Sequence, residues 1–311
     1  MKGLTVAIAG DSTLGSFLAK KGTESDIGLY DLKRSNGAIT YVVPIRYPEK
    51  IQSLVYALGM ADIVVFAVNK IDKFLGEQIV AIDMIGIEHG YMILQNYLQV
   101  DDIKPLISGT VIERYELIEQ DANKINEVIL NRDIPQVDGP AVVPVDHCFN
   151  VKGVGTVILG CVRRGTIRRH DNVEIFPTGK NALVRSIQVH DEDVAEASFG
   201  NRVGVALKGI DASEIERGCI LAPPGSLNTY SSLRLKLEIN KYWKGELHQG
   251  SVVHVAAGLQ IRPAKLIAVS DDGTVETGFE KPLSLSRGEQ VMLLDINSKS
   301  LRLIGKAINL P

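Results

Sequence analysis

The stretch "VPVDHCFNVKGVGTVILGCVRRGTI", Val143 to Ile167, decides the fold of the second half of the chain. Short apolar runs alternate with polar residues and are interrupted by glycines at turn positions. Gly153 and Gly155 permit the tight turn in "KGVGTV", and Gly165 permits the turn in "RRGTI". An apolar period of two, interrupted by glycine turns, is typical of antiparallel β-structure.

This pattern continues to the end of the chain. From Ala141 to Pro311, short β-rich runs are separated by Gly, Pro, Asn and Asp turns, and almost no segment has a helical period. That length fits two barrels or sandwiches better than one. The segment "APPGSL", Ala222 to Leu227, marks the boundary, because proline and glycine end strand pairing. We therefore predict two all-β barrel domains, at residues 137–225 and 226–311.

Residues 1–136 have a different sequence pattern, in which apolar runs alternate with segments of helical periodicity. The runs are apolar on both faces, as in strands of a sheet that is covered on both sides. The pattern predicts an α/β doubly wound domain. We expect strands at Leu4–Gly10, Ile27–Leu32, Ala38–Pro44, Asp62–Val68 and Tyr91–Gln95, and helices at Gly15–Lys21, Pro48–Met60, Phe74–His89, Ile103–Ser108 and Asp121–Leu130.

Composition narrows the class of protein. The chain has 311 residues, of which 45% are hydrophobic and 23% charged, as in ordinary globular proteins. The net charge of −3 hides a gradient: −5 for residues 1–136 (13 basic, 18 acidic), −1 for 137–225 (10 and 11) and +3 for 226–311 (11 and 8). A polyanion would prefer the two C-terminal domains. The three scattered cysteines and the lack of a signal-like or membrane-spanning run indicate a cytoplasmic protein without structural zinc and without a membrane partner.

The segment from Val143 to Leu227 resembles the second domain of the elongation factor Tu family of translation GTPases, through nearly every turn and almost without gaps. The phrases "VRSIQVHD" and "IERGCILA" are similar to the selenocysteine-specific elongation factor in particular, and residues from "LRLKLEINKYW" onward are similar to the third domain of that family. The resemblance implies that residues 1–136 are a P-loop-GTPase-like domain. It also implies two barrels that hold the aminoacyl end of tRNA.

The nucleotide motif of that family is degenerate here. A P-loop has the pattern GxxxxGK[ST], in which amides cradle the phosphates, the Lys binds them and the hydroxyl holds magnesium. Here Gly10 and Gly15 are kept, but Ser16 replaces the lysine, Phe17 replaces the hydroxyl residue, and Asp11 adds repulsion. We expect no bound GTP or magnesium and no GTPase activity. The alternative of a degenerate dinucleotide fingerprint lacks its middle glycine.

The tetrapeptide Asn69-Lys70-Ile71-Asp72 matches the guanine-selecting NKxD box. It follows the fourth expected strand, whereas in the family the box follows the fifth, which here ends in "MILQNYL" without an Asp at the needed step. We therefore interpret NKID as a coincidence at a strand-to-helix junction, with Asp72 capping the helix that follows.

The second domain contains the candidate RNA residues. The resemblance implies that the terminal adenosine and its amino acid lie against the segments that correspond to "VRSIQVHDEDV" and "GNRVGVAL". Such a pocket needs hydrogen-bond donors and a flat stacking surface. The candidates are Arg185, Gln188, His190, Asp191 and Arg202, with phosphate contacts from Arg163 and Arg164. We interpret His147 and Cys148 as a structural histidine and a buried thiol rather than as a nucleophile or metal site.

Two function hypotheses follow. In the first, the chain is a translation-factor relative that binds tRNA or another structured RNA through its barrels, while the α/β domain is a pseudo-GTPase. In the second, the chain is a protein-interaction module that binds a ribosomal or aminoacyl-tRNA synthetase partner, and the barrels are scaffold. An active GTP-binding elongation factor ranks last, because several independent losses would need compensation. The sequence favours no oligomeric state.

Overall fold

The computed structural model describes residues 2–286 and 288–310, and the chain divides into two compact units, Met1–Pro135 and Gln136–Pro311. The predicted fold class, an α/β domain followed by two β-barrels, is confirmed. Of the helices within the described ranges, none is long and apolar enough to cross a membrane.

The first unit contains a seven-stranded sheet in the order β2-β3-β4-β1-β5-β6-β7. Strands β4, β1, β5, β6 and β7 are parallel to one another, whereas β3 pairs antiparallel with both β4 and β2. Apolar residues such as Val6, Ile39 and Val65 are fully buried, as expected for a sheet covered on both faces. The strands are β1 (Gly3–Gly10), β2 (Lys20–Glu24), β3 (Gly28–Arg34), β4 (Gly37–Val43), β5 (Ile63–Val68), β6 (Gly90–Leu94) and β7 (Glu116–Leu117).

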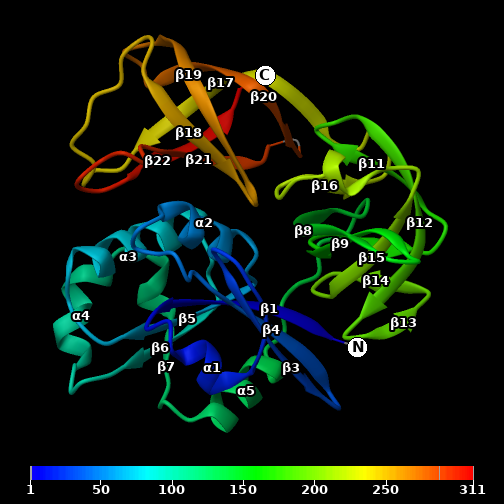
Figure 1. The fold of residues 1–311 in the computed structure, drawn as a ribbon. Helices are drawn as coiled ribbons and strands as arrows, with labels where there is room; N and C mark the ends of the chain where they lie inside the picture. The colour runs from blue at the N-terminus through cyan, green and yellow to red at the C-terminus, as the bar shows by residue number, and fades with distance from the viewer. Residues whose placement is uncertain (1, 287, 311) are drawn as a thin grey trace. The chain divides into compact units, whose positions relative to one another are not determined.

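The helices cover this sheet from both sides. Helix α2 packs against α3, and α1 packs against α5, and Figure 1 shows the two pairs on opposite faces of the sheet. The chain therefore leaves the neighbouring strands β1 and β5 toward opposite faces, the arrangement that creates a ligand crevice in open α/β sheets. The helices are α1 (Leu14–Leu18), α2 (Ile51–Gly59), α3 (Lys73–Ile85), α4 (Val100–Ile107) and α5 (Ala122–Asn131), with a short 3-10 turn at Val111–Arg114.

One predicted helix is wrong in part. The helix expected at Gly15–Lys21 stops at Leu18, and the chain turns into the edge strand β2, which pairs with β3 through Lys20 and Asp31. The unpaired edge of β3 offers hydrogen bonds to this segment, and they outweigh its weak helical pattern.

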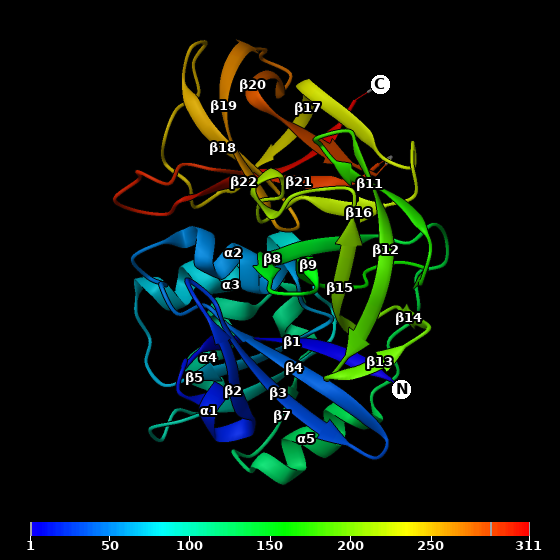
Figure 2. The same cartoon turned by 45° about the vertical axis from the view of Figure 1, so that its right-hand side comes forward.

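The second unit begins with a six-stranded barrel in the order β11-β16-β8-β9-β15-β12, closed by pairing of β12 with β11 (Figure 2). Strand β13 pairs antiparallel with the end of β12, and β10 pairs antiparallel with β14. The inward residues, among them Val145, Ile158, Val184 and Val205, form one continuous core. The strands are β8 (Val143–Val151), β9 (Gly155–Cys161), β10 (Thr166–Arg168), β11 (Asn172–Phe176), β12 (Lys180–Val189), β13 (Glu192–Val194), β14 (Glu196–Ser198), β15 (Arg202–Lys208) and β16 (Ile220–Ala222).

A second closed barrel follows, in the order β17-β20-β19-β18-β21-β22. Its core is built from inward residues such as Leu235, Val255, Leu266 and Leu293, with Trp243 of the β17–β18 loop packed against it. The strands are β17 (Asn228–Ile239), β18 (Val252–Ala257), β19 (Gln260–Val269), β20 (Thr274–Leu285), β21 (Gln290–Leu294) and β22 (Leu303–Asn309).

Candidate functional site

The loop that follows β1 stands where a P-loop would stand, and its path depends on Gly10. This residue has φ +85°, and a Cβ atom there would overlap the carbonyl oxygen of Ala67. Only glycine allows this left-handed conformation and this close approach of two strands. The loop therefore keeps the backbone glycine of a phosphate-binding turn.

Three amide groups at this turn have acceptors within the protein. The Gly10 amide donates to Oε1 of Gln78 at 2.6 Å, and the Asp11 amide donates to the carbonyl oxygen of Ala67 at 2.9 Å. The Thr13 amide donates to Oδ1 of Asp11 at 3.0 Å. A phosphate placed here would have to displace these bonds, because each amide carries a single hydrogen.

The Asp11 carboxylate occupies the mouth of the loop. It accepts hydrogen bonds from Oγ1 of Thr13 at 2.8 Å and from Nε2 of Gln95 at 3.1 Å. Burial alone would raise the pKa of Asp11, but the hydrogen bonds from Thr13 and Gln95 outweigh it and hold this pKa below its ordinary value. Asp11 is therefore a fixed negative charge beside the turn.

The remaining candidate residues of the loop lie in the short helix α1. Gly15 packs against Tyr30 and Val43 with no room for a side chain, and Ser16 donates from Oγ to the carbonyl oxygen of Thr13 at 2.9 Å. Phe17 is 46% exposed. Ser16 carries no positive charge and Phe17 no hydroxyl, so these positions lack the cation and the metal-binding group of a P-loop.

The NKID tetrapeptide follows β5, at the junction with α3. Oδ1 of Asp72 accepts the amides of Phe74 and Leu75, each at 2.9 Å, and its Oδ2 pairs with Nζ of Lys70 at 2.8 Å. Asp72 is the N-cap of α3, as the sequence predicted. The loop after β6 contains Asn96, whose Nδ2 donates to the carbonyl oxygen of Asn69 at 2.9 Å.

Replacing Asp72 by alanine should lower the stability of the first unit by about 1 kcal/mol, the usual value of an N-cap. Lys70→Ala is the matched control, because it breaks only the exposed ion pair and should cost less than about 0.5 kcal/mol. Hydrogen exchange of the first turn of α3 measures both. Equal losses in the two variants would contradict the capping role.

The predicted RNA pocket maps onto the β12–β13 hairpin and its neighbours. His190 and Asp191 form the two-residue turn, both with positive φ (50° and 65°), and Nε2 of Gln188 donates to Oδ1 of Asp193 at 3.1 Å. Gly204 of β15 lies in register with Gln188. Gly204 adds no side chain beside the Gln188 amide, and the nearest neighbour is the side chain of Leu159, which lies 3.5 Å from where a Cβ atom on Gly204 would stand.

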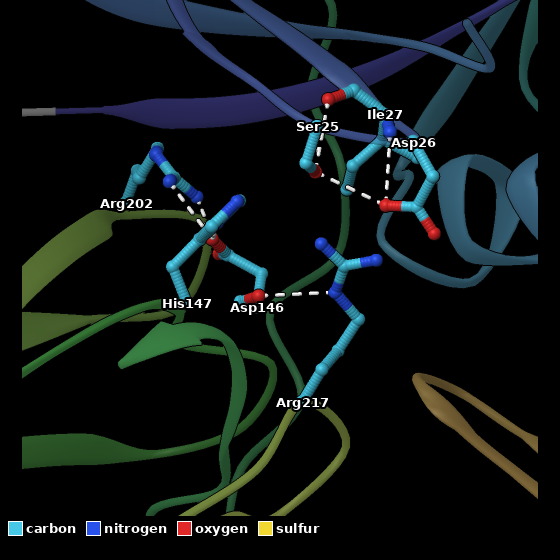
Figure 3. A network of polar contacts seen from close by, with 7 residues as sticks. All are labelled: Ser25, Asp26, Ile27, Asp146, His147, Arg202 and Arg217. Carbon is cyan, nitrogen blue, oxygen red and sulfur yellow. Dashed lines mark hydrogen bonds and ion pairs between the residues drawn. The ribbon is translucent and has the colours of Figure 1, made fainter. Parts of the chain in front are cut away.

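The guanidinium of Arg202, one of the predicted pocket donors, is held by Asp146. Nη1 of Arg202 lies 2.6 Å from Oδ2 and Nη2 lies 3.0 Å from Oδ1 (Figure 3). Nδ1 of His147 lies 2.5 Å from the same carboxylate, and Nε of Arg217 donates to the carbonyl oxygen of Asp146 at 3.0 Å. Arg202 is therefore a member of an ion-pair network, which we call the Asp146 cluster (Asp146, His147, Arg202 and Arg217).

The electrostatics of the Asp146 cluster are strong. The Asp146 side chain is fully buried, and its burial would raise its pKa, but Arg202 and His147 lower it to about 2. Nε2 of His147 is buried and has no hydrogen-bond partner among the described residues. Sequence reasoning missed Asp146 and treated His147 as structural. The one available signal was an aspartate beside a histidine in a strand where apolar residues alternate.

The other candidates are not brought together with this cluster. Nη1 of Arg185, in the middle of β12, donates to the carbonyl oxygen of Val154 at 2.9 Å. Arg163 lies over the ring of Phe199 at 5.9 Å, and Nε of Arg164 donates to the carbonyl oxygen of Pro140 at 3.1 Å. Of the five predicted pocket residues, Gln188, His190 and Asp191 therefore lie together at the β12–β13 hairpin, Arg185 and Arg202 have partners elsewhere, and all five roles stay predictions.

Within the described ranges, no group of three or more His, Cys, Asp or Glu side chains is placed to hold a metal ion. The described cysteines, Cys148, Cys161 and Cys219, form no disulfide, and burial raises the pKa of Cys148 to about 11. A thiol with this pKa is a weak nucleophile at neutral pH.

Comparison with known proteins places these features in a family. A family model described as elongation factor Tu domain 2 matches residues 155–222. An uncharacterized protein of Methanocaldococcus jannaschii is 38% identical over 307 residues, which are 98% of this chain and 99% of that protein. The selenocysteine-specific elongation factor of the same organism is 26% identical over 275 residues, which cover 80% of this chain and 58% of that factor.

Solved structures show the same fold. The translation elongation factor SelB of Methanococcus maripaludis, in complex with the GTP analogue GppNHp, matches with a TM-score of 0.83 and 23% identity, over 100% of this chain and 79% of that chain. A bacterial selenocysteine-specific elongation factor matches with a TM-score of 0.82 and 22% identity, over 99% of this chain and 58% of that one.

Proposed function

We propose that this chain, which belongs to the elongation factor Tu and selenocysteine-specific elongation factor family of translation GTPases, binds the aminoacyl end of tRNA without using GTP. In this proposal the first barrel is the RNA-binding element and the α/β unit is a pseudo-GTPase. The chain would act in the cytoplasm, beside the ribosome or a synthetase.

The loss of nucleotide binding is supported by the loop after β1. Its amides at Gly10, Asp11 and Thr13 already have acceptors within the chain. A triphosphate would also meet the ionised Asp11 without a lysine to offset its charge. Desolvating a polyphosphate without such compensation is unfavourable.

RNA binding is carried by the surface around Gln188. The Gln188 amide lies beside the bare backbone of Gly204, and this strand pair leads to Arg202 and so to the Asp146 cluster. The Gln188 amide offers hydrogen bonds to a nucleobase, and the side chain of Leu159 beside Gly204 offers apolar contact.

Binding assays with aminoacylated and deacylated tRNA test the proposal. We expect preference for the aminoacylated form by about tenfold, equivalent to roughly 1.4 kcal/mol, and affinity that falls steeply with salt. Gln188→Ala should weaken binding of both forms, whereas Asn181→Ala, an exposed residue at the far end of β12, should leave it unchanged. Binding that is insensitive to salt, or equal for any RNA of similar length, would instead favour a protein-interaction module.

A further inference from the structure

A β-bulge in β12 places Arg185 apart from the predicted pocket. The pairing of β12 with β15 shifts between Val184, which faces Leu207, and Ser186, which faces Ala206. Arg185 is the extra residue, and a bulge of this kind redirects the side chain that it carries. Its guanidinium is fixed by the hydrogen bond from Nη1 to the carbonyl oxygen of Val154.

Arg185 lines a hollow of about 530 Å³ on the outside of the first barrel, together with Lys208. Lys208 ends β15 and pairs with Leu183 of β12, so both cations come from neighbouring strands. The rest of the hollow is formed by the β8–β9 turn and the segment after β15. Its other lining residues are Asn150, Val154, Gly155, Thr156, Leu207, Ile210 and Asp211.

Arg185 and Lys208 have no ion-pair partner within the described ranges. By contrast, Lys180, which is also in β12, pairs with Glu214 at 2.7 Å. The hollow contains one carboxylate, that of Asp211. This carboxylate already accepts hydrogen bonds within its own turn: its Oδ1 accepts the amide of Ser213 at 2.9 Å and the Ser213 hydroxyl at 2.7 Å. Two cations against one carboxylate leave the hollow positive.

We propose that this hollow, lined by Arg185 and Lys208, binds the phosphodiester backbone of RNA. A guanidinium with four remaining N–H groups and an ammonium group together match the oxygens of a phosphate, and the exposed apolar side chain of Val154 offers contact to a sugar. The inference rests on the proposed function for its ligand. It assigns Arg185 to backbone contact rather than to the aminoacyl group.

The hollow lies a short distance along β12 from the proposed position of the terminal adenosine. Arg185 and Gln188 lie three residues apart on β12, which corresponds to roughly 10 Å along a strand. The hollow therefore suits the nucleotides that precede the terminal one. Contacts to phosphate position a nucleic acid but carry no information about the base or the attached amino acid.

Binding of tRNA to the Arg185→Ala/Lys208→Ala variant tests this site. Loss of two phosphate contacts on a single strand should reduce the slope of log affinity against log salt by about 1.4 units, equally for aminoacylated and deacylated tRNA. Lys180→Ala, which removes an exposed cation that already has a partner, should leave the slope unchanged. An unchanged slope in the double variant, or an equal loss in the control, would overturn the proposal.

A second measurement separates this site from the proposed function. NMR titration of the labelled protein with a short single-stranded RNA should shift the Arg185 Nε–H resonance even if tRNA shows no aminoacyl preference. Polyglutamate at equal charge, titrated in a separate experiment, serves as the control polyanion. An unmoved Arg185 resonance, or an equal shift with polyglutamate, would overturn a site for RNA backbone.

Discussion

Replacing Arg202 by alanine is expected to lower the local stability of the first barrel by about 3–5 kcal/mol, the cost of leaving a buried carboxylate without its partner. Both oxygens of Asp146 contact the Arg202 guanidinium, and the Asp146 side chain is fully buried. Hydrogen exchange of amides in β8, β9 and β15 measures the effect, because it reports the stability of this barrel separately from the rest of the chain.

The effect of Arg202→Ala should depend on pH. Arg202 and His147 overcome the effect of burial and hold the pKa of Asp146 at about 2, against an ordinary value of 3.8. A depressed carboxylate pKa contributes stability that is present above the ordinary value and is lost as the pH falls toward 2. The shift corresponds to roughly 2 kcal/mol of that stability. The deficit of the variant should therefore be largest at neutral pH and shrink below about pH 4.

A double replacement, Asp146→Leu with Arg202→Met, provides the control. Removing both charges leaves no buried ion alone, so we expect most of the stability to return. A single Arg202→Ala variant that loses less than about 1 kcal/mol at neutral pH would show that water reaches the Asp146 carboxylate and that the ion pair behaves as a surface pair.

The parts of the fold that depend on local chemistry could be predicted from the sequence. Glycine turns predicted the barrels, and Asp72 was recognised as a cap because its role is set by the next three residues. Strand β2 was missed, because the polar segment "KKGTE" has no strand period and pairs only where β3 offers a free edge.

The candidate site depends on contacts that the sequence does not display. Arg202 and Asp146 are 56 positions apart, and their pairing follows from the packing of β8, β9 and β15. Arg185 was grouped with Arg202 by the resemblance, but the bulge after Val184 directs it into another hollow with Lys208. A single extra residue in a strand changes the position of a side chain without changing the apolar pattern that predicts the strand.

Calorimetry with GTP or GDP in the presence of magnesium is expected to show no binding heat. The chain has Ser16 and Phe17 where a P-loop has its lysine and its metal-binding hydroxyl. The carboxylate of Asp11, the side chain of Gln78 and the carbonyl oxygen of Ala67 already accept the amides of Thr13, Gly10 and Asp11, respectively. A dissociation constant at or below about 10 µM, equivalent to roughly 7 kcal/mol of binding, would contradict this prediction and restore the GTPase reading.

Restoring the two missing side chains should not restore hydrolysis. The Ser16→Lys/Phe17→Thr variant regains a cation and a hydroxyl but still lacks the aspartate that anchors the metal from the strand after the switch loop, where "PIRYPEK" stands in this chain. Asp11 would remain, held by Thr13 and Gln95, and would pair with the new lysine in place of a phosphate. GTP turnover by this variant above the uncatalysed rate would contradict this prediction, because it would show that Ser16 and Phe17 alone account for the loss of activity.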